Sequence, residues 1–194
     1  MPPIDVTELT VSYVNISHNL FTGPIPEEWG NLRSLNSLDF SYNQFSGNIP
    51  SNFSAGSTFL NNLVLSHNKL SGRLPDAIFN SGFYNSLDLS HNHLSGTIPD
   101  VFPDTTPFLS FLDLSHNQLS GAIPPKLFTY SSFIVKIKLD HNQFTGPIPD
   151  LGEACTNGLR ELNFVTLNDN KFTGMSICSK QISTCKDFNS FSLI

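Results

Sequence analysis

A thirteen-residue pattern repeats through almost the whole chain, and it constrains the fold more than any other feature. Its clearest copy runs from Leu87 to Pro99 and reads L-x-L-S-x-N-x-L-S-G-x-I-P. The fixed asparagine occurs seven times, at intervals of 24, 25, 24, 25, 25 and 28 residues. A repeat of this length is typical of a solenoid, in which each unit forms one coil and buries its apolar side against its neighbours.

The residues before each fixed asparagine alternate between apolar and polar, which predicts a short strand. In the clearest copy, Leu87 and Leu89 point inward and Asp88 points outward. Because this strand recurs once per coil in the same direction, the strands must stack as a parallel sheet. The outward positions of the seven copies are Asn15, Asp39, Val64, Asp88, Asp113, Lys138 and Thr166.

The fixed asparagine itself has a structural explanation. The chain turns there and leaves backbone groups unpaired, and a buried amide both donates to and accepts from such groups. We therefore predict a ladder of side chains with no direct functional role, made of Asn19, Asn43, Asn68, Asn92, Asn117, Asn142 and Asn170.

The segment after each asparagine combines a glycine, which permits a turn, with a proline, which can start a helical turn. The segments that follow are too short for long helices, so we expect 3₁₀ turns or single α turns on the outer face. Phenylalanines recur there and are expected to fill the outer half of the core. They are Phe53, Phe59, Phe79, Phe83, Phe102, Phe108, Phe128 and Phe133.

The units Leu87–Pro99 and Leu112–Pro124 match every fixed position of the plant-type leucine-rich repeat, which the chain resembles over roughly residues 11–174. That group includes receptor-like kinase and receptor-like protein ectodomains, polygalacturonase-inhibiting proteins and cell-wall proteins. The resemblance implies an α/β solenoid, a right-handed superhelix of about seven coils. It also implies a parallel sheet on the concave face, short helical turns on the convex face, and ligand contacts mostly through the concave sheet.

The repeat divides the chain into an array over residues 1–174 and a short C-terminal cap or tail over residues 175–194. The array begins without a secretory signal or a capping segment, so we expect the chain to start inside a larger protein. Cys178 and Cys185 are predicted to close the C-terminal cap as a disulfide, with two free thiols as the alternative.

Composition excludes several functions. Charged residues make up 13% of the chain and the net charge is −6, so no basic face is present for nucleic acid. Aspartate, serine and histidine occur together in nearly every coil, and seven equivalent open copies provide neither a single pocket nor an oxyanion site. We therefore predict no enzymatic activity, no catalytic residue and no cofactor.

The residues directly before the fixed asparagines form a second column: His18, Tyr42, His67, His91, His116, His141 and Asp169. Equivalent positions in adjacent strands lie about 4.8 Å apart, so the imidazoles should form a line beside the sheet. Three interpretations are open. Histidine simply tolerates a half-exposed position, or the line makes binding pH-sensitive, or it holds a metal ion. No obvious acidic ligand completes a metal site, so we predict none.

An acidic row of outward carboxylates, together with the serines that flank it, suits a basic or polyhydroxyl partner. The row consists of Asp39, Asp88 and Asp113, is extended sideways by Asp140, is interrupted by Lys136 and Lys138, and is flanked by Ser41, Ser66, Ser90 and Ser115. The alternative is a solvated face that deters aggregation. A wide, shallow surface favours a protein or peptide over a small molecule. The candidate partner-binding residues are Asp39, Tyr42, His67, Asp88, His91, Asp113, His116, Lys138 and His141.

These features predict a non-catalytic recognition module, a receptor-like ectodomain or fragment in plant signalling or defence, in the apoplast or at the cell surface. Its partner would be a protein or peptide, with a cell-wall glycosidase or a co-receptor among the candidates. Two alternatives are an inhibitor of the polygalacturonase-inhibitor type and a structural wall protein. Asn15 and Asn52 begin N-x-S sequons and are candidate glycosylation sites.

Overall fold

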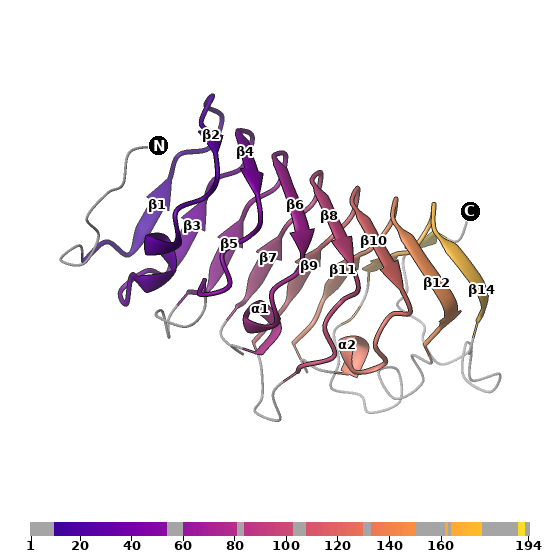
Figure 1. Cartoon of the computed structure of the whole chain (residues 1–194). Coiled ribbons are helices and arrows are strands. Elements are labelled where there is room, and N and C mark those ends of the chain that lie inside the picture. Colours follow the sequence, from indigo (N-terminus) through magenta and orange to yellow (C-terminus); the bar gives the residue numbers. More distant parts are fainter. Residues whose placement is uncertain are drawn as a thin grey trace.

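A computed structural model of the chain describes residues 10–53, 60–80, 84–102, 108–129, 133–149, 162, 164–175 and 190–192. These residues wind into an elongated stack of coils, each carrying one strand on either side of a shared apolar interior (Figure 1). The predicted α/β repeat solenoid is therefore confirmed.

The first sheet contains eight parallel strands and follows the alternating residues predicted from the sequence. Each strand pairs in register with its equivalent in the next coil, as Leu63 does with Leu87 and Leu87 with Leu112. These three leucines are at most 1% exposed, which confirms the inward face. The strands are β1 (Tyr13–Asn15), β3 (Ser37–Asp39), β5 (Asn62–Val64), β7 (Ser86–Asp88), β9 (Phe111–Asp113), β11 (Lys136–Lys138), β13 (Phe164–Thr166) and β15 (Ser190–Ser192).

A second parallel sheet of seven strands lies across the interior from the first, and the sequence interpretation treated this segment only as a turn. Strands β4, β6, β8 and β10 begin just after a fixed asparagine and point one apolar residue inward, such as Leu70 or Leu94. One inward residue is too few to give a recognisable period of two. The strands are β2 (Thr22–Gly23), β4 (Gln44–Gly47), β6 (Lys69–Arg73), β8 (His93–Gly96), β10 (Gln118–Gly121), β12 (Gln143–Ile148) and β14 (Lys171–Met175).

Among the described residues, short helical turns follow three of the coils, as predicted. They are the 3₁₀ helix η1 (Glu27–Asn31) and the single-turn α-helices α1 (Asp76–Asn80) and α2 (Lys126–Thr129). The expected phenylalanine filling is confirmed for Phe53, Phe79, Phe102 and Phe128, which are buried. It is wrong for Phe108 and Phe133, which stack on each other and are 54% and 51% exposed. Phe59 and Phe83 lie outside the described residues.

Within residues 175–194, assigned above to a cap or tail, the structure describes the end of β14 and strand β15. Strand β15 pairs with β13 and so continues the first sheet by one strand. Cys155, Cys178 and Cys185 lie outside the described residues, and the disulfide between Cys178 and Cys185 stays a prediction. No helix in the described part of the chain is long and apolar enough to span a membrane.

Candidate partner-binding face

The fixed asparagines form the predicted ladder and set the shape of every turn. The Asn92 side chain donates from Nδ2 to the carbonyls of Leu65, Leu89 and Ser90 at 3.0–3.2 Å. Its Oδ1 accepts the backbone N–H of Leu70 in the preceding coil at 3.0 Å. Because the amides from Asn43 to Asn170 each join two coils in this way, the ladder fixes the residues on either side of it in a regular column.

The residue before each fixed asparagine adopts a left-handed backbone, with φ between 52° and 54° in all seven copies. Most side chains disfavour this conformation, and histidine and aspartate are among those enriched in it. The recurrence of histidine here therefore has a backbone cause in addition to any functional one. The sequence interpretation of a merely tolerant position missed this strain, because φ cannot be read from the residue type.

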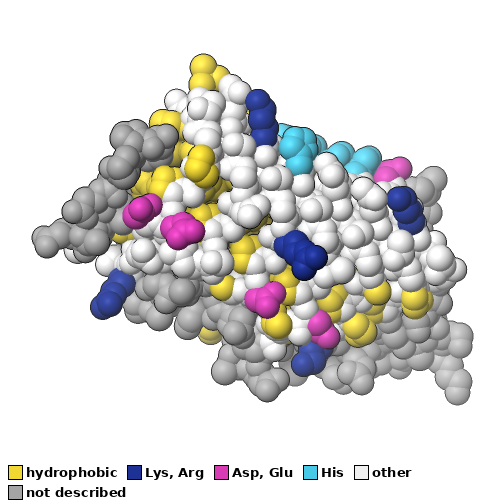
Figure 2. Space-filling view, viewed as in Figure 1, with side chains coloured by type: hydrophobic (Ala, Val, Ile, Leu, Met, Phe, Trp, Pro, Cys, Tyr) yellow, Lys and Arg dark blue, Asp and Glu magenta, His cyan; other side chains and the backbone are white. Residues whose placement is uncertain are grey.

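The rings at these positions stack into one continuous ring column, which comprises His18, Tyr42, His67, His91, His116 and His141. Neighbouring ring centroids are 4.0–4.2 Å apart with interplanar angles of 10–17°. Histidines show as a row along one rim of the molecule in the space-filling view (Figure 2). Burial, followed by the neighbouring imidazoles of His116 and His67, lowers the pKa of His91 below its ordinary value of 6.5.

The carboxylates of the first sheet are oriented by serines from the adjacent turn. In the central coil, Asp88 Oδ1 accepts from the backbone N–H and the hydroxyl of Ser90, at 3.0 and 2.7 Å. The same pair of bonds joins Asp39 to Ser41 and Asp113 to Ser115. These serines are at most 5% exposed, so they hold the carboxylates in place instead of offering hydroxyls to a partner, as the sequence interpretation had allowed.

In the coil that carries β11, a lysine replaces the aspartate of the acidic row. Lys138 Nζ lies 2.9 Å from Asp113 Oδ2 and forms an ion pair with it. Burial alone lowers the pKa of Lys138, but the hydrogen bond to Asp113 and the charges of Asp113, Asp140 and Asp88 outweigh it and raise the pKa above its ordinary value. Asp113 is 4% exposed and is the most buried of the three aspartates in the row.

A groove of about 460 Å³ runs along the outward surface of the first sheet from the second coil to the seventh. It brings together seven of the nine predicted partner-binding residues and leaves out Asp39 and His141. Its lining is polar apart from Val64 and the ring of Tyr42. The lining residues are Ser41, Tyr42, Val64, Ser66, His67, Asp88, Ser90, His91, Asp113, Ser115, His116, Lys138, Asp140 and Thr166.

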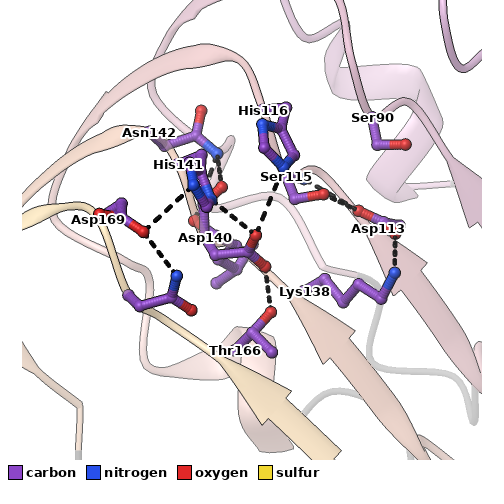
Figure 3. Close-up of polar contacts among 12 residues, drawn as sticks. Ser90, Asp113, Ser115, His116, Lys138, Asp140, His141, Asn142, Thr166 and Asp169 are labelled. Atoms are coloured by element: carbon purple, nitrogen blue, oxygen red, sulfur yellow. Dashed lines mark hydrogen bonds and ion pairs between the residues drawn. The ribbon is translucent and has the colours of Figure 1, made fainter. Parts of the chain in front are cut away.

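The sequence analysis gave Asp140 no role beyond a sideways extension of the acidic row, and the structure places it against the ring column (Figure 3). Its Oδ2 lies 3.1 Å from His141 Nδ1 and 3.9 Å from His116 Nε2. Burial raises the pKa of Asp140, but hydrogen bonds from Thr166 and His141 outweigh it and lower the pKa below its ordinary value. The sequence analysis identified no acidic ligand for the imidazoles, and at this coil the structure places the Asp140 carboxylate beside two of them.

The two sequon asparagines differ in their contacts. Asn15 lies at the exposed end of β1, and its Nδ2 is 3.3 Å from Asp39 Oδ2. Asn52 is half-buried beside η1, and its Nδ2 donates to the carbonyl of Glu27 at 2.9 Å. Because Asn15 is exposed and Asn52 is half-buried, Asn15 is the more accessible acceptor.

The described geometry agrees with known proteins. The Leucine Rich Repeat family model matches residues 10–32, 34–55, 59–81, 85–104 and 108–129. These segments make up more than half of the chain, which therefore belongs to the leucine-rich repeat family, in its plant-type extracellular form. The model matches five repeats, whereas seven fixed asparagines occur; the two further coils are those of β11 with β12 and β13 with β14. No curated protein sequence matches the chain.

Three solved structures show what the chain is similar to. The ectodomain of the Arabidopsis receptor kinase HAESA, in complex with an IDA peptide hormone, has 32% identity and a TM-score of 0.75 over 84% of this chain. The plant peptide hormone receptor RGFR1, in complex with RGF2, has 34% identity and a TM-score of 0.74 over 86% of this chain. The ectodomain of GASSHO1/SCHENGEN3 from Arabidopsis thaliana, in complex with CASPARIAN STRIP INTEGRITY FACTOR 2, has 29% identity and a TM-score of 0.70 over 87%.

This chain spans 26%, 26% and 23% of the lengths of those three chains. These neighbours are extracellular receptor ectodomains that bind ligands.

Proposed function

We propose that this chain is a non-catalytic recognition module that binds an extended peptide, or an extended segment of a protein, along the groove of the first sheet. It would serve as part of a receptor-like ectodomain in plant signalling or defence. One observation carries the proposal: six consecutive coils contribute side chains to a single groove, from Ser41 to Thr166.

The length of the groove fits a short peptide. Its lining residues come from six neighbouring coils of the first sheet, so five spacings of about 4.8 Å give about 24 Å. An extended chain advances about 3.3 Å per residue, and the groove therefore accommodates about seven residues. The open, shallow shape favours a ligand that makes contacts along its length over a small molecule enclosed in a pocket.

The charges in the groove point to Asp88 as the carboxylate that would bind a basic residue of the ligand. Asp39 Oδ2 lies 3.3 Å from Asn15 Nδ2, and Asp113 Oδ2 is paired with Lys138 at 2.9 Å. Asp88 Oδ2 has no partner among the described residues, although Ser90 holds the other oxygen in a fixed direction. A carboxylate that is oriented but half-satisfied near the middle of the groove favours a lysine or arginine of the ligand.

The structural neighbours support a peptide ligand. HAESA, RGFR1 and GASSHO1/SCHENGEN3 are each described in complex with a peptide hormone or a named factor, and a second HAESA complex also contains the co-receptor SERK1. Because this chain spans about a quarter of such ectodomains, the groove is proposed as one segment of a longer binding surface.

A display library of random heptapeptides, selected on the immobilised chain, tests this function. We expect enriched peptides to carry a lysine or arginine and to bind at least about tenfold more weakly to Asp88→Asn, which removes the charge that orients them. Asp100→Asn is the matched control, because Asp100 is exposed and lies outside the groove. Failure to enrich any sequence, or equal loss of binding in both variants, contradicts the proposal.

The two alternative functions predict other results with the same protein. An inhibitor of the polygalacturonase-inhibitor type should block an endopolygalacturonase without selecting heptapeptides. A structural wall protein should adsorb to isolated wall material with no sensitivity to Asp88→Asn. Either result, in the absence of peptide selection, would replace the recognition proposal.

A further inference from the structure

The turn of the β11 coil differs from every other turn beside the ring column. The position two residues before the fixed asparagine is a serine in the first five coils and an asparagine in the seventh. In the sixth coil it is Asp140. The other occupants are Ser17, Ser41, Ser66, Ser90, Ser115 and Asn168. A carboxylate therefore meets the ring column in this way at one turn of the seven.

Three donor atoms converge there. Asp140 Oδ2 is 3.1 Å from His141 Nδ1 and 3.9 Å from His116 Nε2, and one ligand atom from each residue lies within 4.8 Å of the other two. In a zinc site with bonds of about 2.0–2.2 Å, neighbouring ligand atoms are about 3–3.5 Å apart. The separation of 3.1 Å already lies in this range, and that of 3.9 Å is about 0.5 Å too long. The third separation is at most 4.8 Å, so it needs to contract by at most about 1.5 Å.

We propose that His116, Asp140 and His141 bind a divalent transition-metal ion, Zn²⁺, at one end of the groove. Two imidazole nitrogens and one carboxylate oxygen are donors that zinc prefers, and three protein ligands leave a coordination position for water or a partner. His116 and Asp140 line the groove, so that position is accessible from it.

The contacts of His141 strengthen the case for an ion. His141 has a carboxylate oxygen near each ring nitrogen, Asp140 at 3.1 Å from Nδ1 and Asp169 at 3.2 Å from Nε2. The donor and acceptor roles of the two ring nitrogens depend on the tautomer. In the tautomer whose Nε2–H donates to Asp169, Nδ1 can bind an ion that it shares with Asp140.

The surroundings orient the ligands as supporting residues do in metal sites. Thr166 Oγ1 donates to Asp140 Oδ1, which leaves Oδ2 for the ion. Asp169 accepts from Asn168 Nδ2 at 2.7 Å and fixes the carboxylate that holds His141 Nε2. The nearby ammonium group of Lys138 is paired with Asp113 instead of Asp140.

The ring stack must open slightly to admit the ion. The rings of His116 and His141 stack at 4.1 Å and 17°, and an ion in the plane of both lone pairs requires them to turn towards Asp140. Their side chains are 38% and 44% exposed, so the rings can turn without displacing residues of the core. Zinc binding should therefore change the environment of these two rings more than that of His67.

Isothermal titration of the chain with ZnCl₂ at pH 7.5, in a buffer that does not chelate zinc, tests the site. We expect one equivalent to bind, and Asp140→Ser, which restores the residue of the first five coils, to weaken binding at least about tenfold. Asp169→Asn should weaken it less. His91→Gln is the matched control, because it removes a ring of the same column whose turn carries Ser90 at the position of Asp140. It should change the zinc affinity less than about twofold.

The NMR signals of the imidazole rings give a second measurement. They distinguish zinc bound at His116 and His141 from zinc bound by the cysteines. Signals of His116 and His141 should shift on zinc addition, whereas those of His67 should not. The proposal is overturned if the chain binds no zinc, if His91→Gln weakens binding as much as Asp140→Ser does, or if zinc binds without shifting the His116 and His141 signals. None of these results depends on whether the groove binds a peptide.

Discussion

Two columns that are adjacent in the sequence have opposite roles in the molecule. The fixed asparagines of the middle coils, from Asn43 to Asn142, are 6–9% exposed and bond to two coils each. The residues directly before them lie at the surface and stack ring on ring. The interior of the coil thus determines the residue at the asparagine position. Backbone conformation and contacts at the surface determine the residue before it.

The difference shows how a solenoid separates stability from recognition. In the middle coils, four backbone groups of two coils depend on one asparagine amide, as they do on Asn92. The outer column admits Tyr42 and Asp169 among its histidines because it requires only a tolerated left-handed backbone. Substitutions in the first column should therefore affect folding, and those in the second should affect surface chemistry.

The largest expected effect is that of Asn92→Ala. The substitution leaves the carbonyls of Leu65, Leu89 and Ser90 and the N–H of Leu70 without their partner, in a site 6% exposed. We expect the free energy of unfolding to fall by about 3 kcal/mol, because each buried unsatisfied group costs about 1–3 kcal/mol and some will find water. Urea denaturation monitored by circular dichroism measures this loss.

Asn19→Ala provides the control in the first coil. Asn19 is exposed, and within the described part of the chain its Nδ2 donates only to Ile16 and Ser17 of its own turn. Its removal should cost about 0.5–1 kcal/mol, since water replaces an exposed partner. Equal losses in the two variants would show that the ladder between coils contributes nothing beyond the local turn.

The sequence predicted the interior more fully than the surface. The first sheet, the asparagine ladder and the short outer helices follow from periodicity and from the chemistry of amide, glycine and proline. The second sheet was missed because strands such as β8 bury one residue each, which gives no periodic signal. Phe108 and Phe133 were placed in the core by residue type alone, although they lie at the surface.

The candidate site was predicted in outline only. Seven of nine proposed partner-binding residues line the groove. The strand period placed Asp88, Asp113 and Lys138 outward, and the repeat placed the other four in the column before the fixed asparagines. The contact of Asp140 with His116 and His141 was not foreseen, since it depends on side-chain directions at the turn, where the period of two no longer applies. One signal was available: Asp140 replaces a serine present in the first five copies. The pH-sensitive role of the ring column stays a prediction.

An intermediate effect is expected at His91, where φ is 52°. Both His91→Val and His91→Asn remove the ring and its two stacking contacts, but only asparagine adopts a left-handed backbone readily. His91→Val should be less stable than His91→Asn by about 1–2 kcal/mol, which is the cost of this conformation for a β-branched residue. Thermal denaturation of the pair separates backbone strain from stacking; equal stability would mean that stacking alone maintains histidine there.

The smallest effect is expected for Lys138→Met, which removes the ion pair with Asp113 and retains most of the aliphatic side chain. Asp113 keeps both bonds from Ser115, and the lysine side chain is 31% exposed, so water screens part of the interaction. We expect a loss of about 1 kcal/mol that becomes smaller as sodium chloride is raised. Lys136→Met, at a lysine that lies over the rings of Phe111 and Phe164, is the control without a carboxylate partner. If Lys138→Met costs as much as Asn92→Ala, the outward surface contributes to folding as strongly as the interior ladder, and the separation of stability from recognition does not hold.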